Sequence, residues 1–334
     1  MKIVTGANGI IGSHVLLEIA LQGVEVIGCI RRGSDVSKTK RLFEYYDKGE
    51  LYHKVVWREV NTADLFALEE LVRGAKEVYH CAGLVSFDPA QREHLFKVNE
   101  KLTADLVNAC LQERVDMFCH VSSIATINNR DHYGSLDENV FWKKSGKESD
   151  YAWSKYNAER EVWRGMEEGL KAVIVNPGVV LSPGFWEQSS SRLFKVCDEG
   201  NRYYTTGKTA YVGAVDVARA IRILTEGRHT GNRYILSEGN YTFLQILNMI
   251  CDGLDKARPS SQASPWMLKA ASIAEALASP FTSRERRITR PLIDSAFSTQ
   301  DYSNAKIKEV IQFSFKPVPA LIQEICEAYR SKRI

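Results

Sequence analysis

The stretch TGANGIIG at residues 5–12 decides the fold, because it joins a short apolar stretch at residues 2–4 to a segment with helical periodicity. Its glycines have the spacing G-x-x-G-x-x-G, in which Gly6 permits a tight turn and Gly9 lets backbone N–H groups approach a pyrophosphate. Gly12 lets the following helix pack closely on the strand. The pattern predicts a strand, a loop and a helix whose N-terminus would hold a dinucleotide, with a merely structural glycine turn as the alternative.

The same alternation of strand and helix continues to residue 178. Apolar runs predict further strands at residues 25–30, 55–59, 77–81, 117–121 and 172–175. Helical patterns lie between them at residues 38–47, 65–72 and 98–112, and another helix starts near residue 150. About six β-α units in succession indicate an α/β protein with a doubly wound parallel sheet, the Rossmann fold.

Beyond residue 178 this alternation is lost. Helical patterns follow at residues 193–199, 215–226, 243–254, 265–277 and 319–331, and short β candidates at residues 203–206, 211–212 and 234–236. We expect a dinucleotide-binding domain of residues 1–178, joined by about 207–228, where the helix at 215–226 returns to the sheet. The remainder, residues 179–206 and 229–334, would form a smaller, mostly helical substrate-binding lobe that includes the β candidate at 234–236.

The composition is that of a soluble globular protein, with 44% hydrophobic and 25% charged residues among 334. The 44 basic and 41 acidic residues nearly balance, which does not suggest a nucleic-acid-coating surface. Seven scattered cysteines without a C-x-x-C pair argue against a disulfide framework and a zinc site, so a reducing cytoplasm is the expected location. The chain runs from Met1 directly into the glycine loop and has no apolar run of about 18 residues, so we expect neither a signal peptide nor a spanning helix. We expect a small-molecule substrate rather than a membrane or nucleic-acid partner.

Arg31 follows the second predicted strand, where an NAD-binding chain would have an acidic residue for the ribose 2′-hydroxyl. A guanidinium matches a 2′-phosphate in a bidentate fashion. Arg31, with Arg32 or Lys38 as helpers, therefore favours NADP over NAD. The alternative is a solvated basic turn.

Tyr151 and Lys155 are four residues apart at the start of a predicted helix, which places both side chains on one helix face. A nearby ammonium favours the ionised form of a phenol by charge attraction and hydrogen bonding. The pair can therefore act as a general acid or base.

Six motifs occur in order along the chain: TGANGIIG at 5–12, HCAG at 80–83, VSS at 121–123, YAWSK at 151–155, NPG at 176–178 and YVGAVDVARA at 211–220. Together they resemble the extended short-chain dehydrogenase/reductase family, the NAD(P)-dependent epimerase/dehydratase superfamily. Within it, the chain resembles the dihydroflavonol reductase-like and 3β-hydroxysteroid dehydrogenase-like subgroup. The resemblance spans about two thirds of the chain, and it implies an oxidoreductase.

The resemblance also implies roles for individual residues. Tyr151 would be the proton donor or acceptor at the substrate oxygen, and Lys155 would lower the pKa of Tyr151 and hold the nicotinamide ribose. Ser123 would hydrogen-bond the same substrate oxygen, with Ser122 as the alternative. Asn61 stands where the family has an acidic residue for the adenine amino group, although its side-chain carbonyl can accept that bond. The implied cofactor contacts are Gly6, Asn8, Gly9, Ile10, Ile11, Gly12, Arg31, Asn61, Thr62, Cys81, Ala82, Gly83, Asn99, Val121, Tyr151, Lys155, Pro177, Gly178 and Val179.

The expected reaction is hydride transfer between NADP and a carbonyl or secondary alcohol. Two alternatives are a nucleotide-sugar epimerase or dehydratase with tightly bound NAD, and a non-catalytic NADP-sensing protein. Aromatic side chains would face the nicotinamide and suit a ring-containing substrate: Phe87, Tyr133, Phe185, Trp186 and Tyr204. A basic cluster could clamp a diphosphate or form a solvated face: Arg284, Arg286, Arg287 and Arg290.

The resemblance further implies a homodimer. In the family, the helices that begin near Asn99 and Tyr151 pair with their twofold mates as a four-helix bundle. The apolar positions available for that seam, or for covering the protein's own sheet, are Leu102, Leu106, Val107 and Val162.

Overall fold

The computed structural model describes residues 1–128, 134–143, 146, 148–278, 288–332 and 334. Within them lies a seven-stranded sheet whose order is β10-β6-β5-β4-β1-β2-β3, with all neighbouring strands parallel. The strands are β1 (Lys2–Thr5), β2 (Val26–Ile30), β3 (Val55–Glu59), β4 (Glu77–His80), β5 (Met117–Val121), β6 (Ala172–Pro177) and β10 (Asn232–Leu236). The expected doubly wound sheet is confirmed, and the winding reverses between β1 and β4, where such folds bind their ligands.

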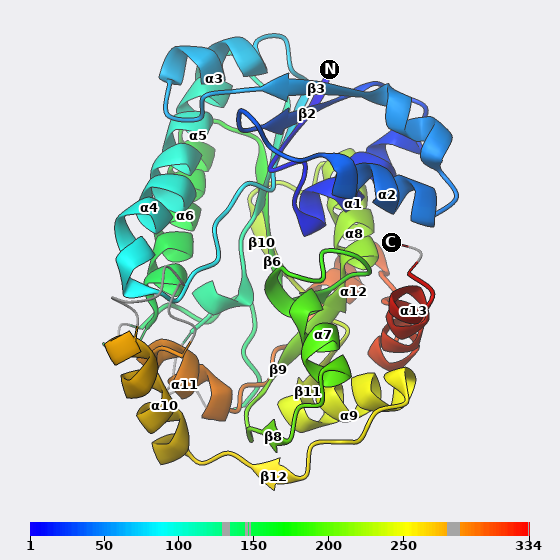
Figure 1. Ribbon diagram of the computed structural model, residues 1–334. Coiled ribbons are helices and arrows are strands. Elements are labelled where there is room, and N and C mark those ends of the chain that lie inside the picture. Colours follow the sequence, from blue (N-terminus) through cyan, green and yellow to red (C-terminus); the bar gives the residue numbers. More distant parts are fainter. Residues whose placement is uncertain (129–133, 144–145, 147, 279–287, 333) are drawn as a thin grey trace.

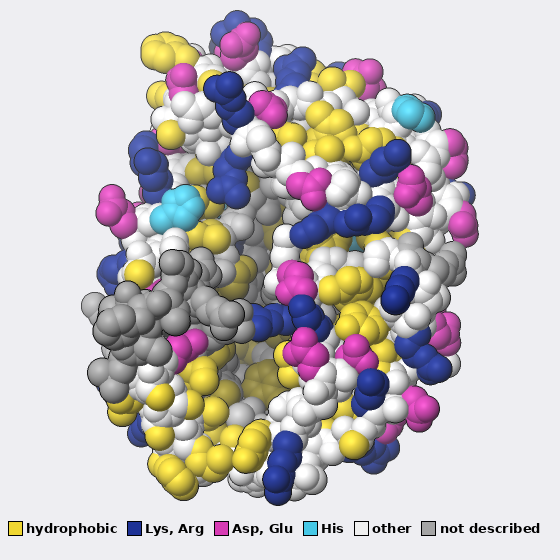
Figure 2. Space-filling view, in the orientation of Figure 1, with side chains coloured by type: hydrophobic (Ala, Val, Ile, Leu, Met, Phe, Trp, Pro, Cys, Tyr) yellow, Lys and Arg dark blue, Asp and Glu magenta, His cyan; other side chains and the backbone are white. Residues whose placement is uncertain are grey.

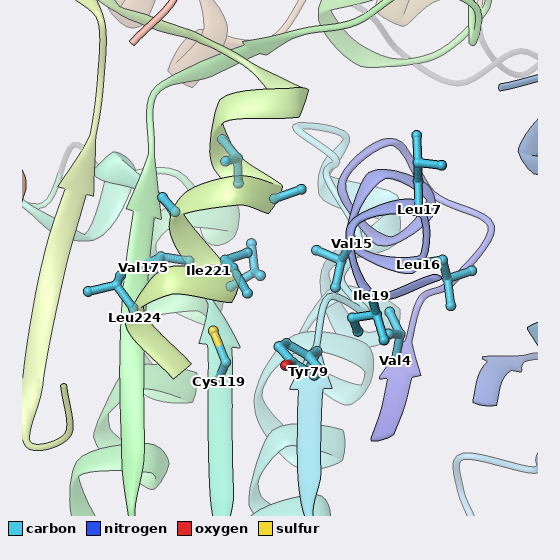
Figure 3. Close-up of a cluster of buried hydrophobic side chains, with 14 of the residues drawn as sticks. Val4, Val15, Leu16, Leu17, Ile19, Tyr79, Cys119, Val175, Ile221 and Leu224 are labelled. Carbon is cyan, nitrogen blue, oxygen red and sulfur yellow. The ribbon is translucent and has the colours of Figure 1, made fainter. Parts of the chain in front are cut away.

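Two hydrophobic cores lie on opposite faces of this sheet. Successive strand residues point to opposite faces, so Ile3 packs in one core and Val4 in the other. One core is covered by α1 (Ile10–Ala20), α2 (Ser37–Tyr45) and α8 (Ala214–Glu226); Figure 3 shows Val15 and Ile221 meeting over the strands there. The other is covered by α3 (Leu65–Val72), α5 (Leu102–Gln112) and α6 (Asp150–Glu167). The expected return of the 215–226 helix to the sheet is therefore confirmed.

The helix predicted at residues 98–112 begins earlier than expected. It starts as α4 (Arg92–Phe96), continues through a π-helical turn (Lys97–Lys101) and runs on as α5. Asn99 therefore lies inside the helix instead of opening it. Its buried side chain forms hydrogen bonds with Leu84 and with Ser154 of α6. Shorter 3₁₀ turns are Gly49–Lys54, Pro89–Gln91, Ile124–Thr126 and Ser189–Ser191.

The second lobe lies beside the carboxyl ends of the strands (Figure 1). It contains a three-stranded sheet of β7 (Val179–Leu181), β9 (Lys208–Gly213) and β11 (Gly239–Thr242), and a pair of β8 (Tyr203–Tyr204) with β12 (Ser261–Gln262). Its helices are α7 (Arg192–Asp198), α9 (Phe243–Leu254), α10 (Pro265–Ala278), α11 (Arg290–Phe297), α12 (Ala305–Ile311) and α13 (Val318–Arg330). Neither α11 nor α12 was expected from the sequence.

One expected part of the second lobe belongs instead to the main sheet. The β candidate at residues 234–236 is the end of β10, which pairs in parallel with β6 from Asn232 opposite Val173 to Leu236 opposite Pro177. Three consecutive buried residues, Tyr234, Ile235 and Leu236, are typical of a strand covered on both faces. Three consecutive apolar residues are too few for the sequence alone to predict a strand that is covered on both faces.

The four apolar positions offered for a dimer seam are not at the surface. Leu102, Leu106, Val107 and Val162 are all buried, and they pack in the core with Phe118 and Ile174 of the protein's own sheet. The second of the two roles considered for them is therefore the correct one. Among the described helices, none has both the length and the apolar composition needed to cross a membrane.

Candidate active site

The glycine loop has no room for side chains. Gly6 has a left-handed backbone (φ +61°), and a Cβ there would lie 2.6 Å from the Cα of Ala82. A Cβ on Gly12 would lie 2.2 Å from the carbonyl oxygen of Gly6. Gly9 is the N-cap of α1, so the first-turn N–H groups, including those of Ile10 and Ile11, have neither an intrahelical acceptor nor a capping side chain. This backbone fits the pyrophosphate of a dinucleotide, which such a helix N-terminus stabilises.

Two contacts position the loop against α2. Ser13 donates its hydroxyl to the carbonyl oxygens of Ala7 (3.2 Å) and Gly9 (2.8 Å), and it also contacts the buried hydroxyl of Thr39 at 3.0 Å. Asn8 donates its amide to the carbonyl oxygen of Asp35 at 3.2 Å. The loop that follows β2 is therefore held directly beside the glycine loop. The sequence patterns did not reveal Ser13 or Thr39.

Arg31 lies in that neighbouring loop. It follows β2 directly, is exposed, and begins a turn closed by the Ser34 N–H on its carbonyl oxygen at 3.1 Å. At the end of the next strand, the side-chain oxygen of Asn61 accepts the N–H of Ala63 at 3.2 Å. The side-chain oxygen of Asn61 has two lone pairs that could accept a bond from an adenine amino group. One of them is used within the turn of residues 61–63, which leads into α3. Thr62 lies in the same turn.

The end of β4 lies against the glycine loop and α6. Ala82 donates its N–H to the hydroxyl of Thr5 at 3.3 Å. Asn99 accepts the N–H of Leu84 at 2.7 Å and donates to the carbonyl oxygen of Leu84 and to Ser154 of α6, both at 2.9 Å. Asn99 therefore fixes the segment that contains Cys81, Ala82 and Gly83, and both N–H groups of its amide are used in doing so.

Tyr151 lies in the first turn of α6, which Ser149 caps by accepting the N–H of Ala152 at 3.1 Å. Burial raises the pKa of Tyr151, and the nearby Ser123 side chain opposes that shift only in part. The ring of Phe87 packs edge-on to Tyr151 with ring centroids 5.9 Å apart, so Phe87 borders this position as expected.

Lys155 lies one helical turn beyond Tyr151 and is 4% exposed. Its Nζ donates to the carbonyl oxygen of Val121 at 2.7 Å. Desolvation lowers the pKa of Lys155 to about 8, opposed by the nearby Glu159 carboxylate and by Cys81. The expected lowering of the Tyr151 pKa by Lys155 stays a prediction; in this structure burial raises that pKa, and Ser123 opposes the rise.

The choice between the two serines follows from their partners. Ser122 is buried and donates its hydroxyl to Oε1 of Glu159 at 2.5 Å. Ser123 instead lies near the phenol of Tyr151 and accepts the N–H of Ala125 at 3.1 Å, at the start of the 3₁₀ turn Ile124–Thr126. The hydroxyl of Ser122 is therefore held by Glu159, and the assignment of Ser123 to the substrate oxygen stays a prediction.

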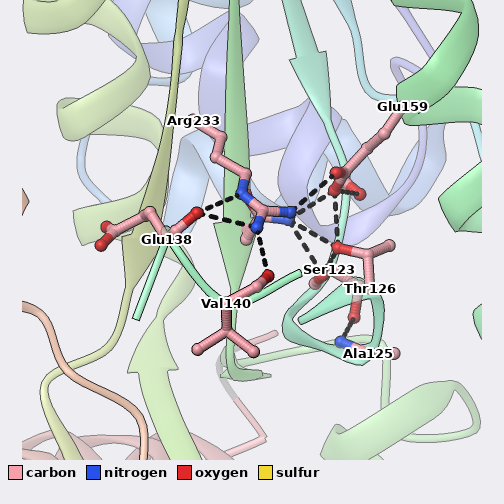
Figure 4. A network of polar contacts seen from close by, with 9 residues as sticks. Ser123, Ala125, Thr126, Glu138, Val140, Glu159 and Arg233 are labelled. Carbon is pink, nitrogen blue, oxygen red and sulfur yellow. Dashed lines mark hydrogen bonds and ion pairs between the residues drawn. The ribbon is translucent and has the colours of Figure 1, made fainter. Parts of the chain in front are cut away.

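Beneath these residues lies a polar network centred on Glu159, which sequence reasoning missed (Figure 4). Glu159 is 2% exposed, and its Oε1 accepts hydrogen bonds from Ser122 (2.5 Å), Thr126 (2.6 Å) and Asn176 (2.6 Å). Its Oε2 forms an ion pair with Arg233 of β10 at 3.4 Å. Glu159 is four residues beyond Lys155 on the same face of α6, and that repeated spacing was the signal available in the sequence.

The network reaches Ser123 directly. Thr126 donates its hydroxyl to the carbonyl oxygen of Ser123 at 2.9 Å, and Asn176 donates its amide to the same oxygen at 3.1 Å. Arg233 also donates to the carbonyl oxygens of Glu138 and Val140 at 2.8–2.9 Å. The backbone of the Ser123 turn is therefore fixed to α6, β6 and β10 together.

Pro177, Gly178 and Val179 connect the two lobes rather than forming a tight turn. Pro177 ends β6, Gly178 donates its N–H to the carbonyl oxygen of Leu236 at 3.0 Å, and Val179 begins β7. A Cβ on Gly178 would lie 2.6 Å from the carbonyl oxygen of Ala210, so only glycine fits there.

The remaining sequence-predicted residues are scattered. Trp186 packs on Phe194 and Tyr329 and donates its Nε1–H to the carbonyl oxygen of Ile334, so its ring serves the core of the lobe rather than a substrate. Phe185 is likewise buried. Arg290 is exposed at the start of α11. Four residues lie outside the described part of the chain: Tyr133, Arg284, Arg286 and Arg287.

Known proteins resemble this chain in sequence and in fold. Residues 2–236 match the model of the NAD dependent epimerase/dehydratase family. Sterol demethylase protein B of Methylococcus capsulatus is 26% identical over 273 residues, which cover 80% of this chain and 78% of that protein. Cinnamoyl-CoA reductase 1 of Arabidopsis thaliana is 28% identical over 246 residues, covering 70% and 69%.

A solved structure shares the whole fold. The crystal structure of gox2253 superimposes with a TM-score of 0.82 at 22% identity and covers 99% of this chain and 98% of its own. This likeness shows the fold, while the family match, over residues 2–236, extends through all seven strands of the main sheet. The chain therefore belongs to the NAD-dependent epimerase/dehydratase family, the extended short-chain dehydrogenases/reductases, and is an NAD(P)-dependent enzyme of that family.

Proposed function

We propose that this protein is an NADP-dependent reductase of a carbonyl group in a small, ring-containing substrate, working in the reverse direction on the corresponding secondary alcohol. The observation that carries the proposal is the position of the Ser123 side chain near the phenol of Tyr151, with Lys155 one turn away on α6. These side chains come from the carboxyl ends of β5 and the start of α6, at the same sheet edge as the glycine loop.

The chain's own residues supply the acid and the oxygen-binding group. When bound, the nicotinamide cofactor supplies the hydride. Because burial raises its pKa, Tyr151 stays protonated near neutral pH and can donate its phenolic proton to an alkoxide. Ser123 can donate a hydrogen bond to that same oxygen, as an oxyanion-binding group does. The carbonyl carbon gains a hydride and its oxygen gains the Tyr151 proton, which gives an alcohol. Tyr151 then regains a proton before the next turnover.

The choice of NADP is supported by Arg31 and by the way its loop is held. The bond from Asn8 to Asp35 keeps the turn after β2 beside the phosphate-binding loop, and Arg31 is exposed there. An exposed guanidinium at this place can take a ribose 2′-phosphate.

An epimerase or dehydratase that keeps NAD bound is the second candidate, because Tyr151, Ser123 and Lys155 would serve its proton transfers equally well. The family to which the chain belongs is described by those two activities. Absorbance and mass spectrometry of the freshly purified protein separate the two, since only the second candidate retains a stoichiometric nucleotide through purification.

Replacing Tyr151 by phenylalanine tests the reaction. Tyr151→Phe removes one hydroxyl, so turnover of a carbonyl substrate should fall by about 10² to 10⁴ while NADPH affinity stays near the wild-type value. Tyr156→Phe is the matched control, because Tyr156 is on the same helix but its ring stacks on Trp142 at 4.6 Å. NADPH oxidation with a panel of ring-containing ketones, whose reduction gives secondary alcohols, measures the wild type and both variants. Wild-type turnover by Tyr151→Phe would show that the assignment is wrong.

A further inference from the structure

His80 is the last residue of β4, lies opposite Thr5 of β1, and uses both of its ring nitrogens. Its Nδ1 lies 2.7 Å from the hydroxyl oxygen of Thr5, and its Nε2 lies 3.0 Å from the hydroxyl oxygen of Thr103 in α5. Burial, and after it the charge of Lys155, lowers the pKa of His80 to about 3, so the ring is neutral near pH 7. A neutral ring therefore joins the strand before the glycine loop to a helix that covers the sheet.

The bonds of the two hydroxyl groups assign the proton on this ring. Thr103 donates its single hydroxyl proton to the carbonyl oxygen of Asn99 at 2.6 Å, so its oxygen can only accept from Nε2 of His80. Thr5 accepts the N–H of Ala82 at 3.3 Å and has its own proton to donate to Nδ1. With the ring proton on Nε2, every polar group in this series of bonds has a partner. With the proton on Nδ1, the bare Nε2 would face an oxygen that has no proton for it.

The direction of these bonds matters for the glycine loop. Because Thr5 gives its proton to His80, the lone pairs of its oxygen are left to accept the N–H of Ala82. Ala82 is also the residue that leaves no room on Gly6, where a Cβ would lie 2.6 Å from the Cα of Ala82. The Thr5 hydroxyl thus joins the chain after β4 to the start of the glycine loop, and His80 sets the direction in which that hydroxyl points.

His80 can act on a cofactor only through these partners. His80 and Thr103 are 0% exposed and Thr5 is 3% exposed, so none of them lines the hollow that Figure 2 shows between the main sheet and the second lobe. We propose that His80 is a positioning residue of the cofactor site. As the Nε2–H tautomer it orients the Thr5 hydroxyl, which holds Ala82 against the glycine loop at the spacing that a dinucleotide needs.

The tautomer is tested on the wild-type protein. Long-range ¹H–¹⁵N correlation spectra of protein with ¹⁵N-labelled histidines distinguish a ring protonated on Nε2 from one protonated on Nδ1. The signals of His80 are identified by their loss in His80→Asn. We expect the Nε2–H pattern at pH 7, and an Nδ1–H or doubly protonated ring would overturn the proposal. This measurement decides the matter even if a substituted protein does not fold.

Two substitutions separate the two contacts of the ring. The side-chain amide of asparagine reaches about as far as Nδ1 of histidine, and that of glutamine about as far as Nε2. His80→Asn therefore keeps an acceptor for Thr5, whereas His80→Gln keeps only a donor for Thr103. His120→Asn is the matched control, because His120 is buried directly opposite His80 in β5 and neither of its ring nitrogens has a partner among the described residues.

Fluorescence titration of NADPH and of NADH, well below the melting temperature of each protein, compares these variants. His80→Gln should weaken the cofactor that binds more tightly by about fivefold, which is typical of one lost hydrogen bond. His80→Asn and His120→Asn should each weaken it less than about twofold, since both keep the bond to Thr5. Equal weakening by His80→Asn and His80→Gln would overturn the proposal, because a purely structural role does not distinguish the two contacts.

One further readout rests on the proposed reductase function. At saturating NADPH, turnover of the ketone panel by His80→Gln should stay within about twofold of the wild type, because Tyr151 and Ser123 take no part in these bonds. Turnover lost at unchanged cofactor affinity would count against the role of His80.

The two proposals fail separately. If Tyr151→Phe keeps wild-type turnover while His80→Gln alone weakens cofactor binding, the reductase mechanism is wrong and the role of His80 stands. If Tyr151→Phe loses turnover while both His80 variants bind cofactor as the wild type does, the catalytic assignment stands and His80 does not position the cofactor site.

Discussion

Glu159→Gln is the most informative single change, because it keeps the shape of the side chain and removes its charge. Oε1 of Glu159 accepts three hydrogen bonds at 2.5–2.6 Å, from Ser122, Thr126 and Asn176. A bond to a charged acceptor contributes about 1 kcal/mol more than one to a neutral amide. Three such bonds give a loss of about 3 kcal/mol in the free energy of unfolding, to which the unpaired Arg233 adds.

Urea denaturation at pH 7 measures this loss. Glu161→Gln is the matched control, because Glu161 is two residues away on α6 and forms a partly exposed ion pair with Arg164, for which about 0.5 kcal/mol is expected. A double-mutant cycle with Arg233→Met should show coupling between the two sites. An unfolding free energy within about 1 kcal/mol of the wild type, or strictly additive single changes, would refute the role of Glu159 as the centre of the network.

A second readout of Glu159→Gln is specific to the active site. The Glu159 carboxylate raises the pKa of Lys155, which lies at about 8 in the wild type. Since the ammonium form is the one that would bind the ribose, NADPH affinity should fall as the pH rises through about 8 in the wild type. Without the carboxylate, the midpoint of that fall should move to lower pH. Fluorescence titration of NADPH from pH 6 to 9 follows it, and an unmoved midpoint would contradict the electrostatic part of the argument.

Three further outcomes are expected. Arg31→Ala should weaken NADPH binding by about tenfold to a hundredfold and leave NADH binding unchanged, and equal affinity of the wild type for both cofactors would be evidence against NADP. Lys155→Met should raise the unfolding free energy at pH 7 by about 3 kcal/mol, since folding lowers the pKa of Lys155 from 10.5 to about 8. The gain should shrink from pH 8 to 10.5, because in that range only the unfolded wild type keeps the Lys155 proton. A difference that is the same at every pH would be contrary evidence. Light scattering at micromolar concentration should give a homodimer mass through the exposed faces of α5 and α6, and a monomer mass would exclude it.

The first 178 residues could be assigned strand by strand because two signals coincide there. Each apolar run is bounded by turn residues, and each is separated from the next by a segment with helical spacing. The second lobe lacks this redundancy. Its strand β7 is three residues long and follows Gly178 immediately. The β candidate at 234–236 was found from the sequence, but its place in the main sheet follows only from its pairing with β6, which is far away in the sequence.

The candidate site divides in the same way. Tyr151, Lys155 and the glycine loop form patterns of residues close together in the sequence, so the sequence alone was enough to predict them. Asn99 was expected at the start of a helix, and its real role depends on Leu84 and Ser154, which only the folded chain brings to it. Glu159 and Arg233 are 74 residues apart, and a partner at that distance leaves no trace in spacing.

The position of β10 at the end of the main sheet bears on how the protein is made. β6 ends at residue 177, but the strand that covers its free edge is not complete until residue 236, after the chain has passed through the other lobe. On the ribosome, the nascent sheet therefore exposes the edge of a buried, apolar strand while some sixty further residues are synthesised. A fragment that stops near residue 178 would lack the strand that pairs with this edge, so we expect such a truncation to aggregate.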